Sequence, residues 1–199
     1  MRRLVCALMM ILALLTGCSG GEQEVSRSAE ELALRIRTEY LAMTACTAAV
    51  DITADYGQRV YEYSMDLSWH KDGETKLTVT APEKIAGITA RIHDGKSYLE
   101  YDGASLETGI ISGTGLSPVE VAPAVINYIG SGYIAACDFE MIEETSLLWF
   151  IFREPGSEPG VGVEAAFWFD PETCALKRAE ILSDGYCVIR CEFRSFTME

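Results

Sequence analysis

The chain has 199 residues, a formal net charge of −14 and 49% hydrophobic residues. The negative charge argues against nucleic acid and against an anionic membrane surface as docking partners, because both repel an acidic protein. Beyond a short leader, this length fits one domain that is large enough to bury a sizeable core.

The first residues have the features of a bacterial export leader. Met1-Arg2-Arg3 is a basic start, and 4–15 is an uncharged apolar run, too short to cross a bilayer of roughly 30 Å as a helix. The next residues, Leu15-Thr16-Gly17-Cys18, resemble the lipobox of bacterial lipoproteins, which are cut before the cysteine and then carry a diacylglyceryl group on its thiol. The alternatives are an ordinary secretory signal with an unrelated cysteine, or an uncleaved anchor.

We therefore expect a lipoprotein signal peptide at 1–17 and a lipidated Cys18, with palmitate-type acyl chains holding the protein at the cell membrane. The protein would lie on the extracytoplasmic face, or at the outer membrane if the host has one. The polar, glycine-containing stretch that follows predicts a flexible tether, so 18–27 is expected to link the anchor to a domain at 28–199.

A helix is predicted to open the domain. Ser28-Ala29-Glu30-Glu31 has the pattern of a capping box, in which a serine and a glutamate satisfy free N–H groups of the first turn. Apolar residues then recur every three or four positions, at Ala29, Leu32, Ala33, Ile36, Tyr40 and Met43. This spacing predicts an amphipathic helix of about four turns whose apolar stripe requires a sheet to cover it.

From residue 46 to residue 110 the apolar period changes to two. Apolar and polar residues alternate over 61–69, which predicts a strand with one apolar face. The turn sequences Lys71-Asp72-Gly73-Glu74, Asp94-Gly95 and Asp102-Gly103 separate this strand from returning ones. The expected strands are 75–80, 85–93, 97–101 and 105–111, in an antiparallel meander.

A second helix and a second set of strands follow. Ser117-Pro118-Val119-Glu120 is another capping box, and the helix is predicted to be interrupted near Pro123 and to end at Gly130. Strands are then expected at 133–143, 147–153, 161–169, 176–183 and 186–196. A sheet of roughly nine to eleven strands must curl to bury one face, so the fold class is α+β, mainly antiparallel β.

The sequence offers little support for an enzyme, a metal or a cofactor. The two histidines, His70 and His93, adjoin turns, and neither a Gly-x-Ser-x-Gly motif nor a CxxC motif occurs. Beyond Cys6 and Cys18, five cysteines remain, an odd number: Cys46, Cys137, Cys174, Cys187 and Cys191. The last two would lie ~13 Å apart on one strand, beyond the ~7 Å limit for a disulfide. We expect most of the five to be small buried apolar residues.

The order of these segments resembles a known family. The resemblance rests on Trp69 before a charged hairpin, on Ala81-Pro82-Glu83, on Asp94-Gly95-Lys96, and on Phe169-Asp170-Pro171-Glu172-Thr173 leading into Leu176-Lys177-Arg178. It is similar to the LolA/LolB-type lipoprotein-carrier superfamily, which includes mycobacterial lipid-binding lipoproteins and clostridial germination lipoproteins. The resemblance implies a strongly curved, open half-barrel with helices on its concave side. It also implies an apolar cavity that carries an acyl chain in several members.

Alternation along the strands predicts which side chains would line such a cavity. They are Tyr61, Tyr63, Met65, Leu67, Trp69, Trp149, Phe167 and Phe169, with Phe139, Ile151, Ile189 and Phe193 also expected to point inward. The same residues would equally form a dry core against the first helix, and the sequence leaves both open. The first functional hypothesis is therefore a lipid- or acyl-chain-binding lipoprotein. The second is a non-enzymatic lipoprotein that binds or activates a cell-envelope or spore-cortex enzyme.

Overall fold

Two helices and one large sheet make up residues 20–110 and 114–199, the part of the chain that the computed structural model describes. The predicted signal peptide and Cys18 lie outside these residues. The helices are α2 (Gly20–Ala42) and α3 (Val121–Ser131), and a 3₁₀ turn, η1, spans Glu83–Ile85. The strands are β1 (Ala45–Asp55), β2 (Val60–His70), β3 (Thr75–Ala81), β4 (Thr89–His93), β5 (Lys96–Tyr101), β6 (Ala104–Ile110), β7 (Ile134–Ile142), β8 (Thr145–Phe152), β9 (Val163–Phe169), β10 (Leu176–Ser183) and β11 (Tyr186–Met198).

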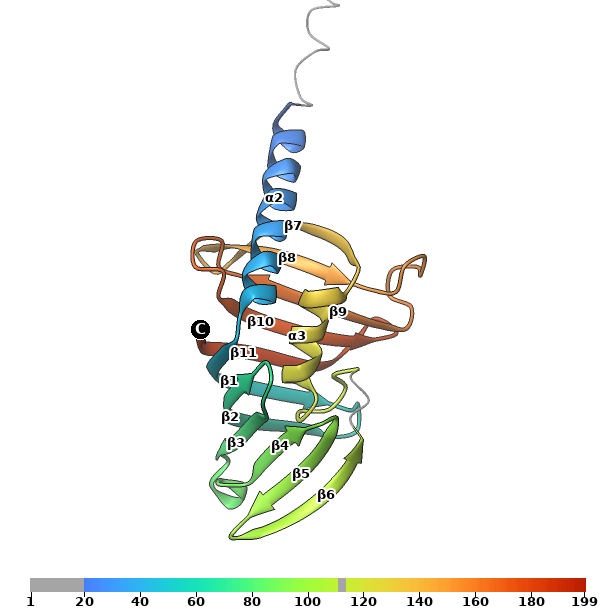
Figure 1. The fold of residues 1–199 in the computed structure, drawn as a ribbon. Coiled ribbons are helices and arrows are strands. Elements are labelled where there is room, and N and C mark those ends of the chain that lie inside the picture. The colour runs from blue at the N-terminus through green and yellow to red at the C-terminus, as the bar shows by residue number, and fades with distance from the viewer. Residues whose placement is uncertain (1–19, 111–113) are drawn as a thin grey trace, which may run out of the picture.

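The strands of the described residues form one antiparallel sheet of eleven, in the order β6-β5-β4-β3-β2-β1-β11-β10-β9-β8-β7. Adjacent strands of the sheet are consecutive in sequence, except in the middle, where the first strand, β1, pairs with the last, β11. The edges are β6 and β7, and the sheet does not close between them. Figure 1 shows this sheet curving beside the two helices, so the predicted α+β half-barrel is confirmed.

The strands in the middle of the sheet alternate between buried apolar and exposed polar residues, as the sequence predicts. In β2, Met65 and Leu67 are buried while Asp66 between them is exposed. β1 pairs with β2 over its whole length, from Ala45 opposite His70 to the far end of both strands. Side chains on opposite faces of a pleated strand alternate, so the apolar members of both strands share the inner face.

One predicted strand is shorter than expected. The sequence predicts a strand over 85–93, but β4 begins only at Thr89. The residues before it form η1 and a turn in which Gly87 has a φ of +89°, a left-handed conformation that an extended strand does not contain. The Gly87 N–H donates to the carbonyl of Val79 over 2.8 Å, which keeps this turn attached to β3.

The first helix is longer than expected. α2 begins at Gly20, so most of the stretch predicted to be a flexible tether is helical, and the capping-box serine, Ser28, lies inside the helix. The stretch contains no proline, and Glu22, Gln23 and Glu24 are good helix formers. A local capping pattern therefore marked a position within the helix rather than its start.

The second helix is not interrupted, contrary to the prediction. α3 runs continuously from Val121 to Ser131 with Pro123 inside it. Pro123 occupies the first turn, where N–H groups have no partner within the helix, so its missing N–H breaks no hydrogen bond. The Gly132 N–H closes the helix by donating to the carbonyl of Tyr128 over 2.8 Å.

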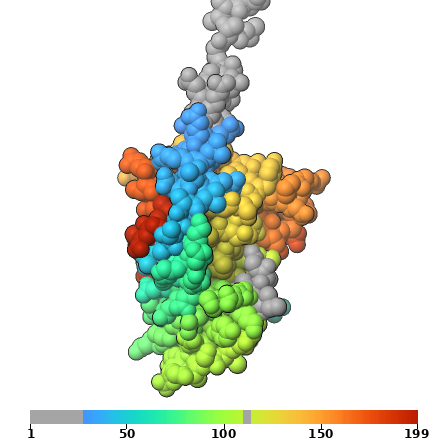
Figure 2. Space-filling model, in the orientation of Figure 1, coloured from blue at the N-terminus to red at the C-terminus, as the bar shows by residue number. Residues whose placement is uncertain are grey.

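The core lies between the helices and the inner face of β1 and β8–β11. Its largest side chains are fully buried and come from both layers: Phe150, Phe152, Phe167, Phe169, Ile36, Ile52, Ile129, Leu148, Leu176, Ile181 and Ile189. α2 contacts α3, β7 and β8. In the space-filling view, α2 (blue) and α3 (yellow) lie against each other above the green β3–β6 end of the sheet (Figure 2).

Candidate functional site

Seven of the eight residues predicted to line a cavity lie on the helix-facing side of the sheet. Four of them are buried in the main core: Met65, Leu67, Phe167 and Phe169. Tyr63 and Trp69 are partly buried and pack against that core, whereas Tyr61 is 38% exposed. Tyr61 stacks on Tyr63 with ring centroids 6.4 Å apart, near the turn of the β1–β2 hairpin.

The eighth residue, Trp149, lies on the other face of the sheet, so its predicted inward orientation is wrong. Trp149 and Ile151 pack against a separate outer cluster of Leu147, Ala166 and Trp168. The inward residues of β8 are its neighbours, with Phe150 opposite Phe167. β8 is apolar from Leu147 to Phe152, so alternation could not tell its two faces apart.

The space beneath the helices is filled by aromatic rings. Phe150 lies 4.9 Å from Phe169, and Phe152 lies 5.2 Å from Phe167, between ring centroids. Tyr128 of α3 reaches into this group, 5.9 Å from Phe152. None of these rings lines the α2–β7 groove or the polar pocket beside β5 and β6 that are described below. The inner face under the helices is therefore a packed core.

Tyr40 joins α2 to this core. Its ring stacks on Phe196 at 5.8 Å and meets the edge of Phe169 at 5.6 Å, and its hydroxyl donates to the carbonyl of Cys174 over 3.2 Å. Burial, with Cys46 and Cys174 nearby, raises the pKa of Tyr40 well above its ordinary value, so the hydroxyl stays protonated. A buried hydroxyl with a carbonyl partner is a structural contact.

Two arginines of α2 hold it to the rest of the domain. Arg37 donates from Nε to the carbonyl of Ile129 over 2.8 Å and from a terminal nitrogen to that of Gly132 over 2.6 Å. These carbonyls lie at the C-terminal end of α3, where a cation is favoured by the helix dipole. Arg35 donates to the carbonyl of Pro171 in the β9–β10 turn.

A shallow groove of about 490 Å³ separates α2 from the edge strand β7. Its lining is mainly apolar and comes from Glu30, Ala33 and Leu34 of α2 and from residues 134–137 of β7. Leu34 is 65% exposed at its rim. Burial, together with Glu30 and Asp138, raises the pKa of the Cys137 thiol in this groove, which keeps the sulfur neutral.

Among the described residues, neither helix packs extensively on the inner face of β5 and β6 at the other end of the sheet. Leu99 of β5 lies opposite Leu106 of β6, and Tyr101 lies opposite Ala104. Leu106 is 65% exposed and Tyr101 is 55% exposed. These residues were not among those predicted to form a site, although Leu106 between Ser105 and Glu107 shows the same period-two pattern as the buried strands.

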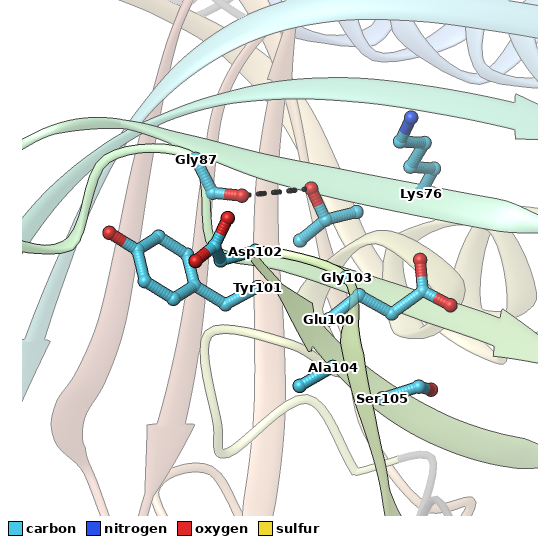
Figure 3. Close-up of a pocket in the computed structure, with 9 residues that line it drawn as sticks. Lys76, Gly87, Glu100, Tyr101, Asp102, Gly103, Ala104 and Ser105 are labelled. Carbon is cyan, nitrogen blue, oxygen red and sulfur yellow. Dashed lines mark hydrogen bonds between the residues drawn. The ribbon is translucent and has the colours of Figure 1, made fainter.

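A polar pocket of about 320 Å³ lies beside the same two strands. Lys76, Thr89, Glu100, Asp102 and Ser105 bring polar side chains to it, and Tyr101 and residues 87 and 103–104 complete the lining (Figure 3). Figure 3 shows the Asp102 carboxylate beside Gly87 and the Lys76 ammonium pointing away from it. Asp102 has a φ of +49° in the β5–β6 turn, a conformation that Asp tolerates better than most residues.

Some of the charged side chains around this pocket form ion pairs and others do not. Arg91 forms ion pairs with Glu74 and with Glu100, the latter at 3.0 Å. Lys96 pairs with Glu107 at 3.1 Å. Within the described ranges, Asp102 forms no ion pair.

The residues weighed for catalysis, redox chemistry or metal binding are dispersed. His70 and His93 are both exposed, and Nε2 of His93 lies 3.3 Å from the Asp94 carboxylate. The five cysteines of the described chain are free; Cys46, Cys174 and Cys191 are buried and Cys137 and Cys187 are partly buried. Burial raises the pKa of Cys46 to about 12, so its thiol is unreactive at neutral pH. In 20–110 and 114–199, no group of three or more His, Cys, Asp or Glu residues could hold a metal ion.

None of the helices in the described part of the chain combines the length and apolar character needed to cross a bilayer.

Comparison with known proteins places the chain by its fold. No protein-family model and no curated protein matches it. An uncharacterized conserved protein from Thermus thermophilus superposes with a TM-score of 0.51 at 10% identity, over 86% of this chain and 88% of that one. A LolA superfamily protein from Nitrosomonas europaea gives 0.48 at 10% identity, over 86% and 93%. The lipoprotein LppX from Mycobacterium tuberculosis gives 0.47 at 17% identity, over 82% and 92%. The superposition on the Thermus protein therefore shows that the chain shares its fold.

Proposed function

We propose that this protein is a lipid-anchored, extracytoplasmic, non-enzymatic lipoprotein that acts by binding a protein of the cell envelope. The anchor is proposed from the lipobox, whose Cys18 would carry the acyl chains. Two acyl chains are sufficient for stable membrane attachment, whereas one is marginal. The acidic chain needs such an anchor, because its net charge of −14 opposes direct adsorption to anionic lipid.

The packing of the inner face is the observation that supports a protein partner. Under the helices this face is occupied by Phe150, Phe152, Phe167 and Phe169, all fully buried, so a ligand there would have to displace core side chains. Exposed apolar side chains lie together on β5 and β6 instead, at Leu99, Tyr101 and Leu106. An exposed apolar patch with a polar rim is typical of a protein interaction site.

A second candidate ligand is an acyl chain, and the groove between α2 and β7 favours it. The groove holds about 490 Å³ and is lined by aliphatic side chains and a neutral thiol. It also lies on the helix that begins two residues after the proposed anchor. Each CH₂ group buried there would contribute about 0.8 kcal/mol to binding.

Recovery of the full-length protein from solubilised membranes distinguishes the two candidates. We expect a stoichiometric protein partner after affinity purification. When the purified material is released from detergent in native mass spectrometry, we expect a mass equal to the sum of the lipidated chain and this partner, with no further bound lipid. Additional mass from bound lipid, removed by Leu34→Trp, which adds bulk at the exposed rim of the groove, would favour the acyl-chain candidate. Recovery of lipid with no protein would contradict a protein partner.

The anchor has its own test. Cys18→Ala should leave the domain folded but abolish incorporation of labelled palmitate and release the protein from the membrane fraction. Cys137→Ala is the matched control, because it removes a thiol from the folded domain. Equal palmitate incorporation in Cys18→Ala and the natural sequence would contradict the lipobox assignment.

A further inference from the structure

The strand β6 is an open edge of the sheet. It pairs only with β5, and it is the terminal strand on its side. The opposite edge, β7, differs because α2 lies against it. In β6 the register shifts beyond Glu107, so the regular part of the edge is 104–107. Four residues of free backbone are enough to pair with a short extended segment.

Some of the features that block further pairing are present at this edge, since it is short, carries Glu107 and ends at a register shift, but others are absent from 104–107. Natural edge strands are protected by lysine, by proline or by inward-pointing charges. Residues 104–107 are Ala, Ser, Leu and Glu, and the inward members are Ala104 and Leu106. Leu106 is 65% exposed and lies opposite Leu99, so an added strand could cover both leucines. Backbone and apolar surface are therefore available at the same place.

The outer face of the same edge carries a recess for one side chain. Ser105 points to that face and borders the pocket of about 320 Å³ that also contains Glu100 and Asp102 (Figure 3). Glu100 is paired with Arg91, which leaves Asp102 as the lining carboxylate without an ion pair among the described residues; Lys76 of the same lining has no ion pair there either. A basic side chain fits this recess by charge.

We propose that β6 is the docking edge for the partner protein, which adds an extended segment to the sheet as a further strand. The segment pairs with 104–107, places an apolar residue over Leu106 and Leu99, and directs a neighbouring Lys or Arg toward Asp102. Because side chains of a strand alternate between faces, the apolar and basic residues must be adjacent in the partner sequence. This inference rests on the proposed function, that the ligand is a protein.

A second copy of this chain is a poorer occupant of the same edge. Antiparallel pairing of β6 with itself around Leu106 would bring together two edges that each carry Glu107 and Asp102. Each copy also has a net charge of −14, so the two would repel before contact. A basic segment could place a positive charge near the Asp102 carboxylate in the recess, whereas a second acidic edge could not.

The first experiment compares capture of the partner by the full-length lipoprotein and two variants. Leu106→Lys places a charge on the inner side of the edge, and Leu41→Lys is the matched control, an exposed leucine on α2 far from β6. We expect the partner to be recovered with the natural sequence and with Leu41→Lys and to be reduced about tenfold with Leu106→Lys. Undiminished recovery with Leu106→Lys would overturn the docking edge while leaving the proposed function intact. If neither the natural sequence nor the control recovers a protein, the proposed function fails.

A second experiment tests strand addition directly with a synthetic peptide of alternating Lys and Val. Fluorescence anisotropy should show binding that Leu106→Lys weakens about tenfold, that Asp102→Asn weakens less, and that salt reduces. The same peptide with alternate backbone nitrogens methylated cannot form the ladder and should not bind. Equal binding of the methylated peptide would overturn strand addition. Sedimentation velocity on the protein alone should show a monomer; a dimer that Leu106→Lys dissociates would assign the edge to self-association instead.

Discussion

Arg153 and Glu164 form the most deeply buried ion pair found in the described residues. Arg153 follows β8, Glu164 lies in β9, and Nε and Oε1 are 3.0 Å apart, with side chains 16% and 9% exposed. The second carboxylate oxygen accepts the Gly160 N–H over 3.0 Å. The pair therefore fixes the long β8–β9 loop to the outer face of the sheet.

Glu164→Gln keeps the size of the side chain but removes its charge, which leaves the Arg153 guanidinium buried without a counter-charge. Breaking such a pair from one side costs about 3 kcal/mol or more. Urea unfolding should therefore show a clearly lower midpoint. The control is Glu107→Gln, whose partner Lys96 is half exposed, and it should leave the midpoint unchanged.

The pH dependence of stability should contain a contribution from Asp170. Burial alone would raise its pKa, but hydrogen bonds from the N–H groups of Thr173 and Glu172 outweigh burial and lower it. A carboxyl whose folded-state pKa is depressed stabilises the fold fully above its unfolded pKa of about 3.9, and this stabilisation is lost as the pH falls through the lower folded value.

Asp170→Asn should therefore lower the unfolding midpoint by a constant amount between about pH 5 and pH 8, and the difference should shrink below about pH 4. Thermal unfolding across this range measures it. Asp66→Asn removes one exposed carboxylate from β2 and controls for net charge. A difference that grows as the pH falls would contradict the assigned sign.

At the scale of elements, the attachment of α3 depends on one side chain from α2. Arg37 bonds two carbonyls at the end of α3, and charge-assisted hydrogen bonds of this kind contribute about 2 kcal/mol. Arg37→Met should leave the domain folded and speed hydrogen exchange at the amides of α3, with smaller changes in β9 and β10. Arg59→Met, in the exposed β1–β2 turn, should change none of these rates. Unchanged exchange in α3 would show that its apolar face alone holds it.

The alternation of apolar and polar residues predicted most strands, but it could not predict the inward face of a strand whose residues are nearly all apolar. β2 contains Asp66 and Ser64 between its apolar residues, so both its position and its inward face were predictable. β8 has no polar residue from Leu147 to Phe152, so its position was predictable but its faces were not, which is why Trp149 was assigned to the wrong side.

The candidate site depends on a relation between distant residues that no local pattern contains. β6 is an edge because β1 pairs with β11, a contact between the two ends of the domain. From sequence alone, Leu106 resembles any inward leucine of a meander, and the lack of a helix above it follows only from where α2 and α3 pack. Turn sequences such as Asp102-Gly103, by contrast, placed the β5–β6 hairpin accurately.

At the scale of the whole molecule, α2 would set the orientation of the sheet toward the membrane. Its 23 residues span roughly 35 Å at about 1.5 Å per residue, and its first turns project past β7 (Figure 1). If Cys18 is anchored, β7 is the membrane-proximal edge, and β6 lies up to about 50 Å away along the sheet at about 4.8 Å per strand. The proposed docking edge would thus face away from the bilayer.

The pairing of β1 with β11 also governs when the domain can fold. β11 is the central strand that joins the two halves of the sheet, so removal of residues 186–199 should abolish cooperative unfolding measured by circular dichroism. A truncated chain that still melts in one sharp transition would contradict this. If the proposed leader directs export, a chain that is still incomplete would lack the strand that both halves require and would stay unfolded during its passage. Because β11 is the last strand of the chain and pairs with both β1 and β10, the complete sheet can form only after β11 has been synthesised.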